Sequence, residues 1–319
     1  MTSEERRPSG QVVTRRRALG GGMAALAVPM LVRPAGAGIV REGNLLASEI
    51  LGHGLPYAIY LPPGYEREGR RYPVIYLLHG GGDGQPADWF RLAGLDVILD
   101  RLIGEGVMPP CIAVAPDGRR PQDARATYFL NDADGGYRWA DMFRQELIPG
   151  IEARYRAIGD PLQRGLMGLS MGGHAAVLNQ LRHPDLFAGA AALSAAFRTS
   201  DELLAMEQPA FDLRFGGAYG AGLEGPARLN DAWRASDVAG VITSLEAQPF
   251  RRIPRLYLDL AADDPFFAGN AAVHVALRDA GIMHRFQVRE GKHDWVFWRA
   301  AFPEALRHLA AIFTRGYGE

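Results

Sequence analysis

The chain has 319 residues, 48% of them hydrophobic, and a formal net charge of −1, which is enough apolar material for the core of one large α/β domain. The charge is unevenly distributed, because residues 1–37 hold six arginines against two glutamates and leave the remainder at about −5. An acidic domain makes nucleic acid a poor partner. The single cysteine, Cys111, excludes an internal disulfide and a cysteine-ligated metal cluster, and its apolar surroundings predict a buried, inert thiol.

Residues 1–37 have the pattern of an export signal. A basic stretch ends in three consecutive arginines at 15–17, a weakly apolar segment rich in glycine and alanine covers 18–32, and Ala35-Gly36-Ala37 follows. This combination is typical of a twin-arginine-type bacterial signal, so we expect cleavage after Ala37 and a secreted, periplasmic or cell-envelope protein. The segment is short and weak for a membrane span, and an uncleaved anchor or a disordered tail is the alternative.

The first half of the remaining chain predicts strands and helices in alternation. Two apolar runs within 44–61, separated by Gly52-His53-Gly54, predict an antiparallel strand pair. The following expected elements are a buried strand at 72–78, a helix at 91–103, a second buried strand at 111–115, a polar loop at 119–137 that borders the site, and a helix at 139–157 bent or restarted at Pro149.

The second half continues the alternation after one interruption. Strands are expected at 165–168, 188–194, 255–260 and 285–290, and helices at 174–181, 270–280 and 298–314. Such an order predicts a mostly parallel, doubly wound sheet with ligand chemistry at the carboxyl ends of its strands. Residues 197–250 break the rhythm and are interpreted as an inserted cap or lid with a helix at 237–246. Residues 38–319 then form a single domain.

The sequence Gly168-Leu169-Ser170-Met171-Gly172 is a G-x-S-x-G nucleophile elbow, placed between an expected strand and an expected helix. The glycines meet a steric demand, because the chain reverses so tightly that a Cβ would collide with the neighbouring strand or helix. The amide of Met171 then lies at a helix start, where partial positive charge favours an oxyanion.

A glycine-rich loop follows the strand at 72–78 and reads His79-Gly80-Gly81-Gly82-Asp83-Gly84. Its glycines let the backbone approach a ligand closely, and we expect the amide of Gly81 to join that of Met171 in an oxyanion hole. A flexible turn is the alternative. A Walker A phosphate loop is excluded, because no Lys-Ser/Thr pair follows.

A serine nucleophile needs a histidine base and a carboxylate that orients it, in the chain order Ser, Asp or Glu, His. Of the histidines beyond the strand at 255–260, only His293 follows a strand in a turn. The acid must follow the preceding strand, where both Asp263 and Asp264 are candidates and Asp264 is preferred. Asp259 lies inside the strand and is expected to be structural. No metal-binding motif appears.

These motifs together resemble the putative-esterase family of α/β-hydrolases, which includes S-formylglutathione hydrolase, feruloyl and acetylxylan esterases, enterochelin esterases and mycolyltransferases. The resemblance covers about residues 40–315 and is carried by Leu78–Gly82, Glu146-Leu147-Ile148-Pro149, the elbow, the Asp264-Pro265-Phe266 turn, and Gly291-Lys292-His293-Asp294-Trp295 with Trp298. It implies ester hydrolysis without a cofactor and substrate-binding aromatics at Tyr128 and Trp295. Ala261 stands where many members have glycine, which leaves Asp263 and Asp264 both open.

The sequence thus predicts an exported serine carboxylic-ester hydrolase that acts through Ser170, His293 and Asp264 and an acyl-enzyme intermediate. Its expected partner is a small-molecule or carbohydrate-linked ester, with no stable membrane insertion after signal cleavage. An acyltransferase of the mycolyltransferase type would use the same three residues, and a non-catalytic binding protein on a hydrolase fold is the remaining alternative. A thioester or peptide substrate would share the acyl-enzyme chemistry. Neither the natural ester nor the oligomeric state follows from the sequence.

Overall fold

The computed structural model describes residues 36–123, 125–245 and 254–315. The expected signal therefore lies outside the described residues, apart from Gly36 and Ala37. Just beyond Ala37, the amide of Gly38 donates its proton to Asp100, and the first described strand starts at Ile39. Within the described residues, no helix is long and apolar enough to cross a bilayer.

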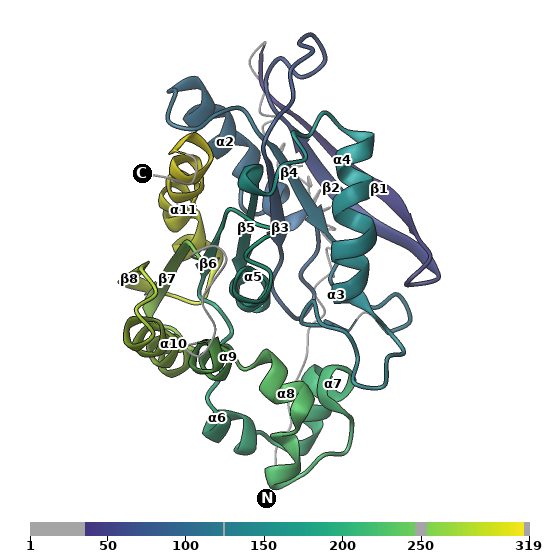
Figure 1. Ribbon diagram of the computed structural model, residues 1–319, viewed down its shortest axis with the longest axis vertical. Helices are drawn as coiled ribbons and strands as arrows, with labels where there is room; N and C mark the ends of the chain where they lie inside the picture. The colour runs from purple at the N-terminus through teal and green to yellow at the C-terminus, as the bar shows by residue number, and fades with distance from the viewer. Residues whose placement is uncertain (1–35, 124, 246–253, 316–319) are drawn as a thin grey trace, which may run out of the picture. The chain divides into compact units, whose positions relative to one another are not determined.

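Among the described residues, eight strands form one sheet in the order β1-β2-β4-β3-β5-β6-β7-β8. β2 pairs antiparallel with β1 and β4, whereas β4, β3, β5, β6, β7 and β8 run parallel (Figure 1). The expected α/β fold with a mostly parallel sheet is confirmed. The strands are β1 (Ile39–Ser48), β2 (His53–Leu61), β3 (Val74–Leu78), β4 (Ile112–Pro116), β5 (Arg164–Leu169), β6 (Gly189–Leu193), β7 (Leu256–Asp263) and β8 (His284–Lys292).

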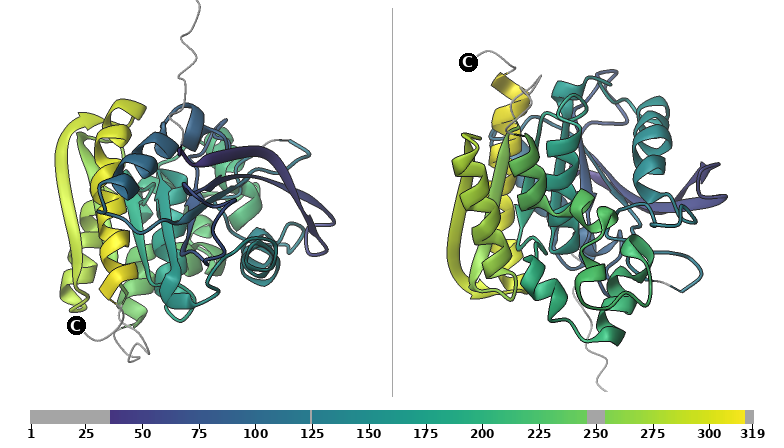
Figure 2. Two further views of the ribbon diagram at one scale, coloured as in Figure 1. Left: turned by 90° about the horizontal axis from the view of Figure 1, so that it is seen from above. Right: turned by 60° about the horizontal axis from the view of Figure 1, so that its bottom comes forward.

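Helices cover both faces of the sheet, as buried strands require. Alternate side chains of β3 enter different cores: Val74 and Tyr76 pack with α4, α5 and α10, while Ile75 and Leu77 pack with α1, α2 and α11. Figure 2 shows these two layers from other directions. The helices are α1 (Asp88–Arg91), α2 (Leu95–Gly104), α3 (Trp139–Met142), α4 (Ile148–Arg154), α5 (Met171–Arg182), α10 (Phe267–Asp279) and α11 (Trp295–Arg315), with a short 3₁₀ turn, η2 (Pro161–Gln163).

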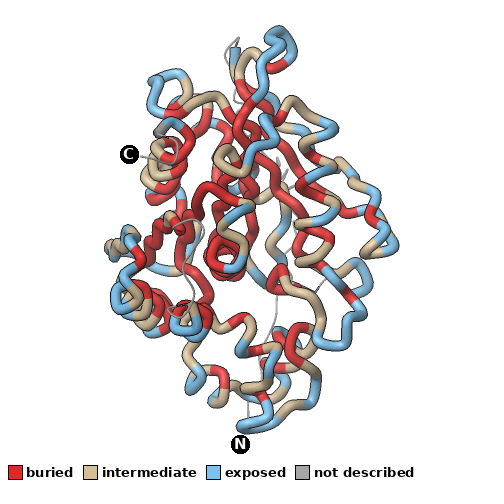
Figure 3. Tube along the Cα trace, in the orientation of Figure 1, coloured by how far each residue is buried: buried red, intermediate tan, exposed pale blue. Residues whose placement is uncertain are grey.

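The central strands are almost fully buried, and every residue of β3, β4, β5 and β6 is inaccessible to solvent or nearly so (Figure 3). Cys111, just before β4, has no exposed surface, as expected, and burial raises the pKa of its thiol to about 12. β4 lies on one side of β3, whereas β5 and the strands after it lie on the other side. The carboxyl end of β5 is therefore at the point where the strand order switches.

The predicted helix 91–103 is divided, since Arg91 ends α1 and α2 starts at Leu95. Two other helices differ from their predicted form for a clear physical reason. The predicted helix 139–157 contains a π-helical turn, η1 (Phe143–Leu147), one turn ahead of Pro149, because proline has no N–H for the carbonyl of Gln145 and its ring crowds that carbonyl. The last helix starts at Trp295 instead of 298. Asp294 explains the difference, since its Oδ1 accepts the amide protons of Val296 and Phe297 at 2.9 and 3.0 Å.

The segment between β6 and β7 is the one that the sequence analysis predicts to be a lid. It is helical and lies at the carboxyl side of the sheet (Figure 1). Arg228 is buried and joins two of its helices, donating to the carbonyls of Leu203, Leu204 and Met206 and to the Gln208 side chain. Residues 246–250 of the expected segment lie outside the described residues. Its elements are α6 (Ser200–Leu204), α7 (Gln208–Tyr219), η3 (Gly225–Arg228), α8 (Asp231–Ser236) and α9 (Val238–Leu245).

Candidate active site

Ser170 occupies a strained turn between β5 and α5, with φ of 53° and ψ of −119°. Residues other than glycine rarely adopt a positive φ, and such backbone strain is typical of a functional position. The turn is held by Ser170 backbone bonds to Leu193 and Ala196 at 2.9 and 2.8 Å. A methyl group at Gly172 would overlap the carbonyl of Leu78, and one at Gly168 would overlap the carbonyl of Gly172. The elbow therefore requires glycine at both places.

His293 lies in the turn after β8 and contacts two predicted partners at once. Its Nε2 is 3.0 Å from Oγ of Ser170, and its Nδ1 is 3.1 Å from Oδ2 of Asp264. An ionised carboxylate can only accept, so Nδ1–H of His293 donates to Asp264. Nε2 of the neutral ring is then free to accept the hydroxyl proton of Ser170. The imidazole is partly exposed, with 23% of its surface accessible.

Asp264 follows β7 and its carboxylate is fully buried. Burial raises its pKa, but hydrogen bonds from His293 and from the amide of Phe266, at 2.9 Å, outweigh that effect, and the pKa is lowered overall. Asp263 is 80% exposed and faces Lys292 at 3.9 Å. Asp259 forms an ion pair with Arg289 at 2.7 Å inside the sheet. Only Asp264 of these three is brought to His293.

The glycine loop after β3 lies against the start of α5. A methyl group placed on Gly81 would be 3.7 Å from Cβ of Met171, so the two backbones are neighbours beside Ser170. Met171 opens α5, and the first amides of a helix have no partner within it. His79 fixes the loop: its Nε2 accepts from the amide of Gly118 at 2.8 Å, and its Nδ1–H donates to Gly80 at 2.7 Å.

A cavity of about 540 Å³ opens beside Ser170 and His293. We call it the active-site cavity. Its other lining residues come from the glycine loop, the loop 119–137, the middle of α7 and the turn after β7: Gly81, Gly82, Asp123, Arg125, Ala126, Tyr128, Leu213, Arg214, Pro265 and Phe266. Tyr128 is buried and has φ of 55°, a second strained position at the site.

The two aromatic residues named by the resemblance lie in different surroundings. Tyr128 lines the active-site cavity, whereas Trp295 is not among the described residues that line it and packs edge-on against Trp298. Trp298 in turn packs against His293 with ring centres 5.0 Å apart, and Phe266 packs on the same ring at 5.1 Å. These two rings restrict the orientation of the imidazole.

Sequence reasoning missed Arg198, which follows β6. Its guanidinium donates to the hydroxyl of Tyr128 at 3.0 Å and lies over the ring of Phe266 at 4.7 Å. One signal could have found it, because Arg198 comes shortly after the carboxyl end of a parallel strand, the edge on which the other site residues lie. The interrupted strand–helix rhythm instead places this residue within the expected lid.

The sheet order, the serine at a strained elbow and the carboxylate-oriented imidazole beside it define the α/β-hydrolase class. A family model described as Putative esterase matches residues 48–309, and the chain belongs to that family. Esterase Rv1288 of Mycobacterium tuberculosis strain H37Rv is 30% identical over 253 residues, which are 74% of this chain and 51% of that protein. The chain thus spans about half the length of such relatives.

Solved structures share the fold. A ferulic acid esterase superposes with a TM-score of 0.72 and 27% identity, covering 87% of this chain and 99% of the other. An S-formylglutathione hydrolase from Agrobacterium tumefaciens superposes with a TM-score of 0.67 and 19% identity, covering 88% of this chain and 98% of the other, which speaks for the fold alone.

Proposed function

We propose that the chain is an exported carboxylic-ester hydrolase in which Ser170 is the nucleophile, His293 the general base and acid, and Asp264 the residue that orients His293. The observation that carries the proposal is the pair of His293 contacts, 3.0 Å to Ser170 and 3.1 Å to Asp264. Separate loops bring these groups within hydrogen-bond reach, as nucleophilic catalysis by serine requires.

In the first half-reaction, Oγ of Ser170 attacks the ester carbonyl carbon while its proton moves to Nε2 of His293. The tetrahedral oxyanion accepts hydrogen bonds from the amides of Met171 and Gly81, each contributing about 3 kcal/mol of barrier lowering. The bond to the leaving oxygen then breaks, and His293 returns the proton to that oxygen. The lowered pKa of Asp264 keeps the carboxylate charged beside the imidazolium that forms.

In the second half-reaction, water attacks the acyl-enzyme carbonyl and gives its proton to His293. Collapse of the second tetrahedral intermediate releases the carboxylic acid and returns the proton to Ser170. The relatives support an ester substrate, since one is named an acetyl esterase and others carry feruloyl or ferulic acid esterase in their names. The segment after β6 acts as a lid that shapes the site.

The direct test compares Ser170→Ala with Ser244→Ala on the full chain, using p-nitrophenyl acetate hydrolysis and fluorophosphonate labelling. Ser244 is a suitable control because it lies on α9 and donates its hydroxyl to the Val241 carbonyl. Ser170→Ala is expected to lose labelling and about 10⁵-fold or more in kcat, with an unchanged melting temperature. Persistent labelling of Ser170→Ala would disprove the assignment of the nucleophile.

Export is proposed on the sequence pattern of residues 1–37. The test expresses the chain in a host with a twin-arginine pathway. The mass of the protein recovered from the cell envelope or the medium is then measured. A mature chain starting at Gly38 is expected, and full-length protein retained in the cytoplasm would contradict export.

A further inference from the structure

A second cavity, of about 420 Å³, opens at the edge of the sheet opposite to the active site. We call it the basal cavity. Its lining comes from the starts of β7 and β8 and from the second half of α11, whereas Ser170 and His293 follow the carboxyl ends of their strands. No described residue lines both this cavity and the active-site cavity. A ligand of the basal cavity is therefore separate from the ester that reacts at Ser170.

The basal cavity is lined by positive charge. Three arginines from different elements contribute to it: Arg255 just before β7, Arg285 on β8 and Arg307 on α11. No Asp or Glu is among the described residues that line it. The chain beyond residue 37 is acidic as a whole, so this concentration of positive charge opposes its net charge. A recess lined by one sign of charge attracts ligands of the opposite sign.

His284 also lines the basal cavity, but both of its ring nitrogens are already engaged. Its Nδ1–H donates to the carbonyl of Ile282 at 2.8 Å. Its Nε2 lies 2.7 Å from Nδ1 of His274. The arginines are therefore the groups of the basal cavity that can bind an anion.

His308 reports how close these arginines are. Burial lowers the pKa of His308 to about 4, and the positive charges of Arg285 and Arg255 act in the same direction. The imidazole is consequently neutral at neutral pH, while the two guanidinium groups that affect it remain charged. Positive charges from separate elements thus converge on one wall of the basal cavity.

Two of the arginines have hydrogen-bond donors available to a ligand. Arg285 is exposed, and within the described ranges its side chain has no hydrogen bond or ion pair. Arg307 forms an ion pair with Glu304 at 2.5 Å, between side chains that are 41% and 36% exposed. Exposed pairs of this kind are weak, and a guanidinium carries five N–H donors. An anion in the cavity can therefore bind Arg307 without loss of a strong contact.

We propose that the basal cavity binds a dianionic phosphate group, which accepts hydrogen bonds from Arg285 and Arg307 with Arg255 beside them. A single guanidinium can already match both oxygens of a carboxylate. A phosphomonoester has a charge of about −1.5 to −2 and three acceptor oxygens, so it suits several guanidinium groups that approach from different elements. The volume lies in the range that small-molecule sites occupy.

The phosphate group has two possible sources, a soluble phosphomonoester or the headgroup of a lipid. In both cases the active site stays open, because the two cavities lie at opposite edges of the sheet. On a surface that carries phosphate groups, the catalytic edge would face away from that surface.

The test titrates inorganic phosphate into the full chain by calorimetry at constant ionic strength, with acetate as the comparison anion. We expect phosphate to bind at least tenfold more tightly than acetate, because acetate offers two oxygens and one charge. The titration is repeated with Ser170→Ala, so the result does not depend on esterase activity. Equal affinities for the two anions would overturn the proposal.

Charge reversal locates the phosphate. Arg285→Glu and Arg307→Glu are each expected to weaken phosphate binding at least tenfold. Arg278→Glu is the matched control: it makes the same change in net charge, but Arg278 is 65% exposed, pairs with Asp279 and is not among the lining residues. A loss of at most twofold is expected there. Unchanged binding in both folded cavity variants, or an equal loss in the control, would overturn the site.

Two further probes distinguish the sources. Glycerol 3-phosphate is titrated into the chain, and co-sedimentation is measured with phosphatidylcholine vesicles that contain or lack phosphatidic acid. Binding of glycerol 3-phosphate that Arg285→Glu abolishes supports a soluble ligand. Sedimentation that requires phosphatidic acid and is lost in Arg285→Glu supports a lipid headgroup. Absence of both would overturn a phosphomonoester as the ligand.

Kinetics separate the basal cavity from the active site. At constant ionic strength, phosphate at saturating concentration is expected to leave kcat/KM for p-nitrophenyl acetate unchanged within about twofold. Competitive inhibition that persists in Arg285→Glu would place the phosphate at the active site and overturn the proposal.

Discussion

Nε2 of His293 lies 3.0 Å from Oγ of Ser170, although the two residues are 123 positions apart in the chain. The contact exists because β5 and β8 are parallel strands of one sheet, so that the loops after them meet at the same edge. The orientation of His293 is set by Asp264 on one side and by the rings of Phe266 and Trp298 on the others.

Asp264→Asn is expected to lower kcat for p-nitrophenyl acetate by about 10⁴-fold, because an amide can donate to Nδ1 and favours the tautomer that cannot accept the Ser170 proton. Asp263→Asn is the matched control. Its side chain is 80% exposed, so the change in rate is expected to be at most about twofold. If Asp263→Asn were the inactive variant, the acid would be misassigned.

Gly172→Ala is expected to destabilise the fold by about 3 kcal/mol or more, since the new methyl group would overlap the backbone carbonyl of Leu78. Gly81→Ala makes an informative comparison: its methyl group would meet Met171 at an ordinary 3.7 Å, so its cost in unfolding free energy is expected to stay below about 1 kcal/mol. Urea denaturation measures both. Equal stabilities of the two variants would contradict the geometry of the elbow.

Stability is expected to fall as the pH drops from about 6.5 to about 4, because burial lowers the pKa of both His174 and His308 to about 4. In that window the unfolded chain binds protons that the folded chain does not, so each histidine costs up to about 1.4 kcal/mol per pH unit. The lowered pKa of Asp264 acts below this window, where protonation of its carboxylate removes further stability.

The measurement is the unfolding free energy from urea titrations at several pH values. His308→Gln removes one titrating group and is expected to make the acid slope shallower, while the slope between pH 7 and 8 stays flat in both proteins. An acid slope identical to that of the wild type would show that His308 does not contribute.

Signal cleavage after Ala37 would place a new amino group on Asp100, whose Oδ1 accepts the Gly38 amide at 2.9 Å and the Tyr60 hydroxyl at 2.7 Å. We therefore expect Asp100→Asn to destabilise the chain that starts at Gly38 by up to about 1 kcal/mol more than it destabilises the uncleaved chain. Thermal denaturation of the four proteins gives the difference. Equal losses in both backgrounds would exclude the ion pair.

Much of this arrangement could be predicted from the sequence, because it depends on local rules. Ser170, Asp264 and His293 each follow a parallel strand, and parallel strands present their carboxyl ends at one edge. The choice of Asp264 over Asp263 is open in the sequence. It depends on which of two adjacent carboxylates turns inward, and that direction is set by tertiary packing against His293.

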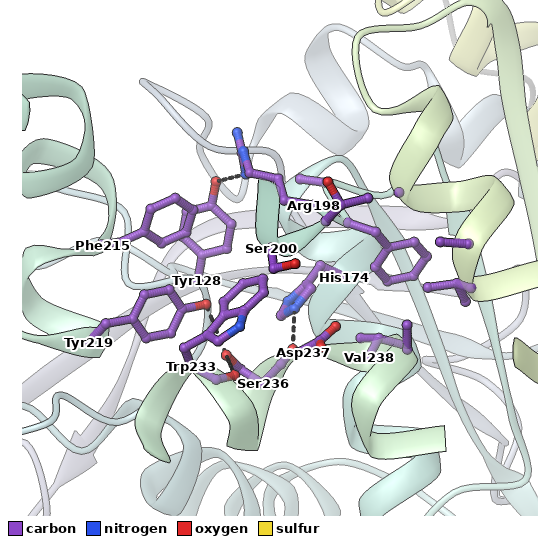
Figure 4. A pocket seen from close by; sticks show the side chains of 17 residues that line it. Tyr128, His174, Arg198, Ser200, Phe215, Tyr219, Trp233, Ser236, Asp237 and Val238 are labelled. Carbon is purple, nitrogen blue, oxygen red and sulfur yellow. Dashed lines mark hydrogen bonds between the residues drawn. The ribbon is translucent and has the colours of Figure 1, made fainter. Parts of the chain in front are cut away.

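The surroundings of His174 could not be predicted in the same way. The sequence predicts only that His174 lies in a helix. The environment of its side chain depends on how α8 and α9 pack over it (Figure 4). The contact of Trp295 with Trp298, at 5.1 Å between ring centres, likewise does not follow from the sequence pattern. Contacts between helices of a lid follow no short-range periodicity, so the amino-acid pattern carries no signal for them.

Trapping of the acyl-enzyme tests the central proposal most directly. The wild-type chain is mixed with p-nitrophenyl acetate, quenched in acid within the first turnovers and digested for peptide mass mapping. We predict an acetyl group on Ser170 and no such adduct in Ser170→Ala. Hydrolysis that persists in Ser170→Ala, or an acetyl group found on another residue of the wild-type chain, would contradict the account.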